Sequence, residues 1–298
     1  VSPSLDDCPV VLAIKEIPIP ELQAEKTYLF FSHTIKGQPA NMPMLRRLME
    51  LGCQLLDYER MVDEQGKRVV FFGNYAGLAG MIDTLWALGQ RFSAEGIPTP
   101  FEGLRPALAY GDLETARQAI SAVGAQIIRE GLPEEITPLV CGFAGYGNVS
   151  RGAQEIFDLL PVIEVNPAEL AQLKPGDAHH VFKVVFKEED IVETVDPQTP
   201  FALQDYYEHP EKYRSRFESY LPALTVLING IFWTPRYPRL VTKAGLRALF
   251  ERALLEQAPC PRLRVIGDIS CDTEGAIECT LHATTPGSPV YVYDPITG

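Results

Sequence analysis

The segment spanning residues 138–167 restricts the fold of this chain more than any other. An apolar run, PLVCG, leads into FAGYGNVSRGAQEIFDLLP, and the strand-like run VIEVNP follows. Strand, glycine-rich turn, helix and strand within about 30 residues is the pattern of a dinucleotide-binding βαβ unit. Glycine lets a turn pass close to a pyrophosphate, and the next helix presents unpaired N–H groups and the positive end of its dipole. We therefore predict a dinucleotide site here, the alternative being a glycine turn without a ligand.

Composition excludes several other classes of protein. The 298 residues suggest about two domains. A net charge of −13 disfavours binding to a nucleic acid backbone, and no uninterrupted apolar run reaches the roughly 18 residues of a membrane span. The six cysteines form no CxxC and the five histidines no HExxH, so we expect reduced thiols and no metal site. These features are typical of a soluble intracellular protein, of the cytoplasm or the mitochondrial matrix.

The remaining patterns predict an α/β fold made of two Rossmann-like domains with parallel sheets and an active site in the cleft between them. Short β-rich runs at 10–15 and 28–32, followed by a helical stripe at 43–51 for which Asn41 is a candidate N-cap, begin the first domain. We assign residues 1–72, joined by 282–298, to an incomplete substrate domain. Residues 73–281 form the dinucleotide-binding domain, with an insertion at 168–221.

Small residues at the start of a helix after residue 72 predict close packing against another helix. They are Ala76, Gly77, Ala79 and Gly80. Because glycine costs roughly 1 kcal/mol in a helix, the packing has a purpose, either at a domain junction or for stability alone.

Two residues follow the first two predicted strands and are candidates for proton transfer. Lys15 and His33 come where those strands end, at the edge that faces the ligand crevice in open α/β sheets. The alternatives are a solvated ion pair of Lys15 with Glu16 and a structural role for His33. Three basic residues follow in polar turns, namely Lys36, Lys67 and Arg68. They are candidates for binding an anionic substrate, the alternative being a solvated rim.

The end of the VIEVN run bears on the choice of cofactor. NAD enzymes commonly place an acidic residue there for the ribose 2′-hydroxyl, whereas this chain has Asn166. An uncharged residue does not repel a 2′-phosphate, so Asn166 favours NADP(H), with NAD(H) as the alternative. Asn166 is also a candidate cap before Pro167.

The motifs SHTIKGQPANMP, GFAGYGNVSRGAQEIF, LINGIFW and GDISCDTEGAIE, in this order, resemble the lysine-ketoglutarate reductase part of the bifunctional aminoadipic semialdehyde synthases. They are similar, less closely, to the fungal saccharopine dehydrogenases of the lysine-forming type. The resemblance implies an alanine dehydrogenase-like fold and the reversible reductive condensation of L-lysine with 2-oxoglutarate to saccharopine, with NADPH. It also implies roles for individual residues.

By the resemblance, Lys15 and His33 match the acid/base pair, Glu16 and Glu59 match carboxylates that modulate the pKa values of that pair, and Lys36 and Arg68 match positions on the substrate side. The positions that match the cofactor cleft are Gly142, Gly145, Tyr146, Gly147, Asn148, Asn166, Asn229, Gly230 and Asp268.

The resemblance also implies an N-terminal segment before this chain and a saccharopine dehydrogenase (glutamate-forming) part after it, so we expect a fragment of a longer protein. Two alternatives follow. One is a truncated, non-catalytic dinucleotide-binding module. The other is an alanine dehydrogenase-like enzyme that aminates a small 2-oxo acid with ammonia, which the GNVSRGAQEIF and SHTIKGQ runs fit poorly.

Overall fold

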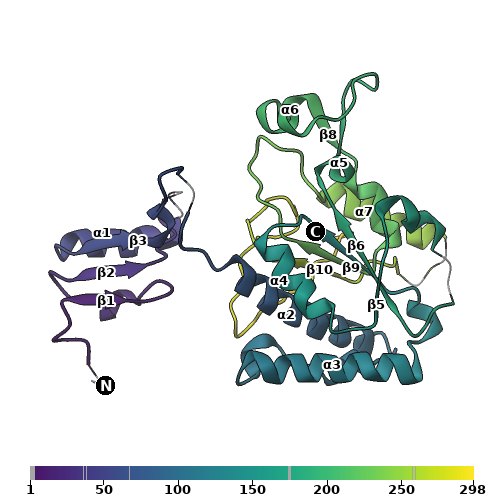
Figure 1. Ribbon diagram of the computed structural model, residues 1–298, viewed down its shortest axis with the longest axis horizontal. Helices are drawn as coiled ribbons and strands as arrows, with labels where there is room; N and C mark the ends of the chain where they lie inside the picture. The colour runs from purple at the N-terminus through teal and green to yellow at the C-terminus, as the bar shows by residue number, and fades with distance from the viewer. Residues whose placement is uncertain are drawn as a thin grey trace. The chain divides into compact units, whose positions relative to one another are not determined.

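A computed structural model describes residues 4–35, 37, 39–66, 68–173, 176–256, 258 and 260–298. The chain divides into two compact units, Val1–Phe72 and Gly73–Gly298, each with its own sheet (Figure 1). All strands pair in parallel within the main sheet of each unit. The predicted α/β fold with parallel sheets is confirmed.

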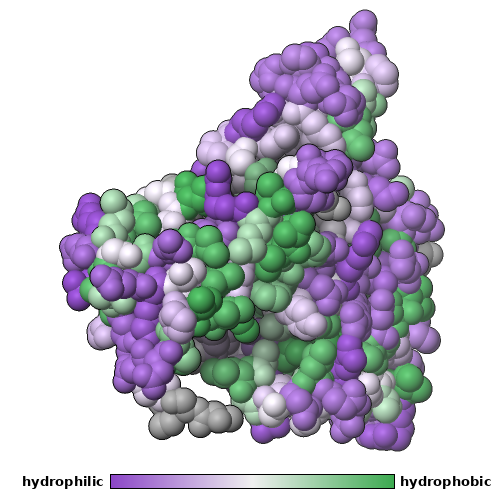
Figure 2. Space-filling model, turned by 60° about the vertical axis from the view of Figure 1, so that its left-hand side comes forward, coloured by the Kyte–Doolittle hydropathy of each residue, from purple (hydrophilic) through white to green (hydrophobic). Residues whose placement is uncertain are grey.

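The smaller unit is a three-stranded sheet with one helix packed against it. Strands β1 (Val10–Leu12), β2 (Thr27–Phe30) and β3 (Gln54–Asp57) lie in that order, and α1 (Met42–Glu50) connects the last two. Met44 and Leu48, four residues apart on one helix face, are buried against Val11 and Tyr28. Some apolar side chains of this unit lie at the surface, for example that of Leu12, which is 69% exposed. Figure 2 shows such apolar areas among hydrophilic ones.

The larger unit is built on a sheet of five parallel strands in the order β10-β9-β4-β6-β5. These strands are β4 (Val140–Ala144), β5 (Val162–Glu164), β6 (Val181–Phe186), β9 (Val226–Asn229) and β10 (Val265–Asp268). One apolar core contains residues of α2 (Gly73–Ala94), α3 (Leu113–Glu130) and α4 (Asn148–Phe157). A second contains residues of α7 (Lys243–Leu255) and of the segment after β6. All five residues of β4, at the centre of the sheet, are buried.

Helices α2 and α4 approach each other closely, as the small residues predict. A Cβ atom at Gly77 would lie 2.0 Å from the carbonyl oxygen of Val149, and one at Gly152 would lie 2.0 Å from that of Asn74. Gly80 faces the side chain of Ile269 instead. All these residues belong to the larger unit, and the contact fixes the start of α4 relative to α2.

The predicted insertion contains a strand of the main sheet. Residues 181–186 form β6, which pairs with β4 and β5. The strand carries Lys183, whose buried ammonium is paired with Asp158 (2.8 Å) and Glu164 (3.3 Å). After β6 come α5 (Glu188–Ile191), β7 (Val192–Thr194), α6 (Leu203–Glu208) and β8 (Tyr213–Ser215), with β7 and β8 antiparallel.

The contacts described for the C-terminal segment lie within the larger unit. The Tyr291 hydroxyl donates to the carbonyl oxygen of Cys279 at 2.8 Å, and Arg247 donates to that of Ile296. The assignment of 282–298 to the substrate domain stays a prediction, as do the other domain boundaries.

Candidate functional site

The smaller unit brings the two predicted proton-transfer residues together. Lys15 follows β1 and His33 follows β2, and the ladder between those strands continues as the Phe31 N–H donates to the Ile14 carbonyl oxygen at 3.2 Å. Because parallel strands end at the same edge, the side chains meet there, with Lys15 Nζ 3.5 Å from His33 Nε2. Glu16 completes the cluster through a hydrogen bond between its Oε1 and His33 Nδ1.

This cluster defines the state of the imidazole. A carboxylate accepts hydrogen bonds and does not donate them, so the Nδ1 atom of His33 carries the proton shared with Glu16. In the neutral ring the lone pair then lies on Nε2, the atom that faces the Lys15 ammonium. Lys15 and His33 can thus exchange a proton, while the carboxylate of Glu16 orients the ring.

Asn41 fixes the loop that carries His33, a role of Asn41 that the sequence did not predict. His33 has a backbone φ of +49°, a conformation uncommon for residues other than glycine. The Asn41 amide donates to the carbonyl oxygens of Ser32 (3.2 Å) and His33 (3.3 Å) and to Glu16 Oε1 (3.3 Å). Asn41 precedes α1 but makes no side-chain capping bond to it. Asn41 thus occupies the predicted N-cap position of α1, but its side chain does not cap the helix, because the amide bonds to the loop of His33 instead.

Glu59 and Arg68 form a second pair in the same unit. Arg68 Nη2 lies 3.2 Å from Glu59 Oε1, and the Glu59 side chain is 10% exposed, whereas that of Arg68 is 48% exposed. Glu59 Oε2 is buried and has no hydrogen-bond partner among the described residues. Arg68 therefore keeps donors available to solvent or to an anion. Lys36 and Lys67 lie outside the described residues.

In the larger unit, the glycine-rich turn stands at the carboxyl end of β4. Gly142 lies inside the strand, where a Cβ would press on Leu224 and Phe186 at 2.9 Å, so it serves core packing. Gly145 has a φ of +94°, and Gly147 is the N-cap of α4. A Cβ at Gly147 would meet no atom within 4 Å, which leaves open space beside the helix N-terminus that begins at Asn148. This arrangement fits a pyrophosphate.

A pocket of about 380 Å³ opens beside the turn, and half of its lining residues are aromatic. Glu188 is its charged residue among the described residues, and it accepts hydrogen bonds from the hydroxyls of Tyr146 (3.1 Å) and Tyr207 (2.7 Å). The charge of Glu188 raises the pKa of Tyr146, and burial together with Glu188 raises that of Tyr207. Both phenols therefore stay protonated donors at neutral pH. An apolar pocket with a few placed polar groups is typical of a small-molecule site.

The lining residues of this pocket come from three segments of the chain. The first is the turn at 145–147, and the second, from the end of β6 to α6, contributes Phe186, Glu188, Ile191, Tyr206 and Tyr207. The third, after β9, contributes Gly230, Ile231, Phe232, Trp233, Tyr237 and Pro238.

Asn229 and Asp268 end β9 and β10 and bond to each other inside the protein. Asn229 Nδ2 donates to Asp268 Oδ1 at 2.8 Å, and Asn229 Oδ1 accepts from the Ile231 N–H at 3.3 Å. The Thr280 hydroxyl donates to the other oxygen of Asp268, and burial raises the pKa of this carboxyl. These side chains hold the loops after the two strands, and of the predicted residues there only Gly230 lines the pocket.

Asn166 caps a short 3-10 helix (Pro167–Gln172), as its alternative role predicts. Its backbone N–H and its Nδ2 donate to Glu169 Oε2 at 2.7 Å and 3.2 Å. Its strand, β5, is the outermost of the sheet and is separated from β4 by β6.

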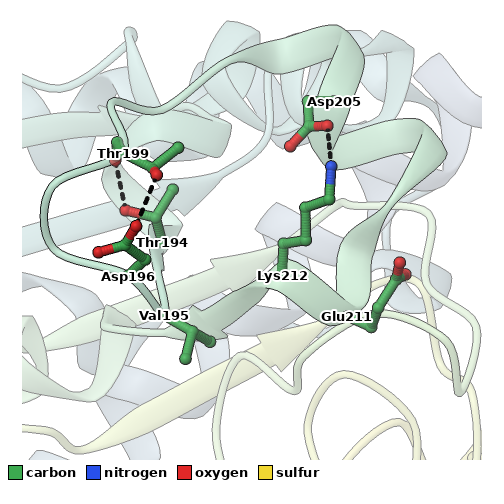
Figure 3. A pocket seen from close by; sticks show the side chains of 7 residues that line it. All are labelled: Thr194, Val195, Asp196, Thr199, Asp205, Glu211 and Lys212. Carbon is green, nitrogen blue, oxygen red and sulfur yellow. Dashed lines mark hydrogen bonds and ion pairs between the residues drawn. The ribbon is translucent and has the colours of Figure 1, made fainter.

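A further pocket lies in the segment after β6 (Figure 3). Its polar groups bond to one another, since Lys212 Nζ contacts Asp205 Oδ1 at 2.6 Å and the Thr199 hydroxyl contacts Asp196 Oδ2 at 2.9 Å.

Among the residues that the structure describes, no cluster of three or more His, Cys, Asp or Glu side chains is arranged to hold a metal ion. Within the same residues, no helix has the length and hydropathy needed to cross a membrane.

Nearly the whole chain is similar to alpha-aminoadipic semialdehyde synthases. It is 39% identical to that of Arabidopsis thaliana, over 99% of this chain and 28% of the relative. It is 40% identical to the mitochondrial synthase of Rattus norvegicus, over 96% of this chain and 32% of the relative. The predicted resemblance is confirmed. The chain spans less than a third of the length of these synthases.

The predicted, weaker similarity to the fungal saccharopine dehydrogenases is found as well. A saccharopine dehydrogenase (NAD+, L-lysine-forming) of Neurospora crassa is 24% identical over 95% of this chain and 59% of the relative. Among solved structures, an L-alanine dehydrogenase aligns with a TM-score of 0.46 and 14% identity, over 96% of this chain and 62% of that one. No family model matches the chain.

Proposed function

We propose that this chain carries the reductase activity that condenses L-lysine with 2-oxoglutarate to give saccharopine, using NADPH, in a reversible reaction. The cluster of Lys15, His33 and Glu16 is the observation that carries the proposal, because it pairs two proton-transfer groups whose contact atoms are defined. The similarity to the synthases and to the lysine-forming dehydrogenase supports this choice of substrates. The name of the mitochondrial relative supports an intracellular site for the reaction.

The chemistry requires protons to move at defined steps. The lysine ε-amine, once deprotonated, adds to the keto carbon of 2-oxoglutarate, and the resulting hydroxyl leaves as water to give a C=N bond. His33 Nε2 takes the proton from the attacking nitrogen and returns one to the leaving hydroxyl, while Lys15 relays protons to and from the same atom. NADPH, held by residues of the larger unit, would supply the hydride that reduces the carbon of this bond. In the reverse direction the same groups act in the opposite order.

Positive charge in the smaller unit suits the carboxylates of these substrates. Arg68 is half exposed and gives only one described contact to Glu59, so its planar guanidinium can pair with a carboxylate in two-point fashion. We assign this role to Arg68 and, by the resemblance, to Lys36. Glu59 then fixes the orientation of the guanidinium.

In the larger unit the residues fit a dinucleotide. Gly145 and Gly147 shape the turn, open space lies beside Gly147 at the N-cap of α4, and the pocket lies next to them. We propose that residues 145–148 hold the pyrophosphate and that Gly230 permits close approach at the end of β9. We prefer NADPH in this proposal because the resemblance to the synthases implies it, and NAD(H), the cofactor printed in the name of the Neurospora crassa dehydrogenase, is the alternative.

Replacing His33 by Gln tests the proposal. We expect turnover to fall at least tenfold, since general acid/base groups typically contribute about 10²-fold or more, with NADPH binding unchanged. Oxidation of NADPH is followed by absorbance with lysine and 2-oxoglutarate together and with each omitted. His282→Gln is the matched control, because His282 stacks on Tyr291 in the C-terminal segment. Unchanged turnover in His33→Gln would contradict the assignment.

The same assay separates the alternatives. Turnover with ammonia in place of lysine would favour the alanine dehydrogenase-like enzyme. Saturable NADPH binding without any turnover in the unaltered chain would favour the non-catalytic module.

A further inference from the structure

The strand order of the larger unit changes which residues lie next to the glycine-rich turn. In the usual dinucleotide-binding sheet the strand after the first helix lies beside the glycine-rich strand, and its end contacts the adenine ribose. Here α4 leads to β5, which lies at the outer edge of the sheet, and β6 occupies the position beside β4. The five strands fill five positions of the usual six-stranded sheet, but the strands in two of those positions are exchanged in chain order.

The end of β6 therefore takes the place that the end of β5 has in the usual fold. The N–H of Gly145 donates to the carbonyl oxygen of Phe186, the last residue of β6, at 3.0 Å, which ties this strand end to the turn. The next two residues are Lys187, which is exposed, and Glu188, which lines the pocket with residues 145–147. A positively charged residue, Lys187, and a negatively charged one, Glu188, thus follow the end of β6 next to the turn.

The end of β5 lies too far away for the same task. Glu164, its last residue, pairs with Lys183, and β6 runs three residues further before it reaches the turn. At about 3.3 Å per residue along a strand and 4.8 Å between strands, Asn166 is several ångströms short of the edge and about 10 Å to the side of β4. Both its N–H and its amide already bond to Glu169.

We propose that the adenine ribose of the cofactor, with its 2′ substituent, is bound at the end of β6 by Lys187 and Glu188, and not at the end of β5. This rests on the dinucleotide site of the proposed function. Lys187 carries the charge that pairs with a 2′-phosphate. Glu188 accepts hydrogen bonds from ribose hydroxyls, since each of its oxygens has one described tyrosine donor and a carboxylate accepts about four hydrogen bonds in all.

Direct binding of NADPH and NADH to the unaltered chain and to single variants, followed by calorimetry, tests this inference without turnover. Lys187→Ala should weaken NADPH binding about tenfold, the loss of one charge-assisted contact, and leave NADH binding within about twofold. Glu188→Gln should weaken NADH binding severalfold and leave NADPH binding the same or tighter. Lys212→Ala removes a lysine of the same segment that is bonded to Asp205 and should change neither affinity.

Asn166→Ala decides between the two strand ends. Our inference expects the ratio of the two affinities to stay as in the unaltered chain. A changed ratio in Asn166→Ala, or an unchanged ratio in both Lys187→Ala and Glu188→Gln, would overturn it while leaving the dinucleotide site intact. Absence of saturable binding by the unaltered chain would instead overturn the cofactor part of the proposed function together with this inference. Circular dichroism spectra of the variants control for folding.

Discussion

Replacing Gly77 by Ala should destabilise the larger unit strongly. The new Cβ would lie 2.0 Å from the Val149 carbonyl oxygen and 2.7 Å from the Ala153 nitrogen, both backbone atoms of α4 that cannot rotate away. Ordinary contact begins near 3.4 Å, so α2 and α4 must separate by about 1.4 Å at this point. Overpacking of this kind costs about 1–3 kcal/mol or more, against a gain of about 1 kcal/mol in helix propensity. We expect a net loss of about 2 kcal/mol in the free energy of unfolding.

Urea unfolding followed by tryptophan fluorescence measures this loss in the correct unit, because both tryptophans, Trp86 and Trp233, lie in the larger one. With a urea slope of about 2–3 kcal/mol per M, the midpoint should fall by about 1 M. Dinucleotide binding should weaken as well, since Val149 is the second residue of α4 and the helix start moves with it.

Gly80→Ala is the matched control on the same helix. Its Cβ would lie 2.6 Å from Ile269 Cγ1, a side-chain atom that can shift where the backbone of α4 cannot. The same gain in helix propensity then offsets most of the cost, and we expect the free energy of unfolding to change by less than about 1 kcal/mol. Equal midpoint shifts in the two variants, or a stabilised Gly77→Ala, would refute the reasoning from backbone contact.

Two further predictions concern the packing of the larger unit. Burial raises the pKa of the Cys279 thiol from 9.0 to about 11. At pH 8 its thiolate fraction, and hence its rate of alkylation by iodoacetamide, should therefore be about a hundredfold lower than for a free thiol. Labelling at the rate of a free thiol, followed by mass spectrometry, would contradict this. The Thr242 hydroxyl accepts a hydrogen bond from the Gly245 N–H at 2.9 Å and donates one to Glu218. Thr242→Ala should therefore lower the free energy of unfolding in urea by about 1–2 kcal/mol, and Thr242→Ser, which keeps the hydroxyl, should lower it less. An equal loss in both variants would exclude capping as the cause.

Local sequence patterns are sufficient to predict parts of both sites. The proximity of Lys15 and His33 follows from two strand ends in a parallel sheet, and the turn at Gly145 and Gly147 follows from glycine spacing before a helix. Both inferences need only residues near each other in the chain and one rule of sheet geometry. The sequence predicts Asn41 at the N-cap position, where asparagine is common, but only the position of His33 shows what its amide bonds to.

Tyr207 and Glu188 lay beyond such reasoning for a different reason. Tyr207 belongs to α6, in the segment after β6, and reaches the pocket only because that segment folds back over the carboxyl edge of the sheet. Its hydrogen bond to Glu188 spans 19 residues of sequence. Spacing rules describe a single helix or strand and contain no information about which segment returns to which edge.

The exchanged positions of β5 and β6 have a physical cause that the sequence does contain. Central strands of a parallel sheet are covered on both faces and need continuous apolar runs, whereas edge strands do not. VFKVVF has five apolar residues in six and five of the six are buried, while the three residues VIE are half-buried or exposed. Lys183 does not break the pattern, because Asp158 and Glu164 neutralise its charge at the sheet edge. Ranking strands by the length of their apolar runs, instead of by their order after the glycine-rich turn, places β6 beside β4. The residue that contacts the ribose is then sought after the longest neighbouring run, at Lys187 and Glu188.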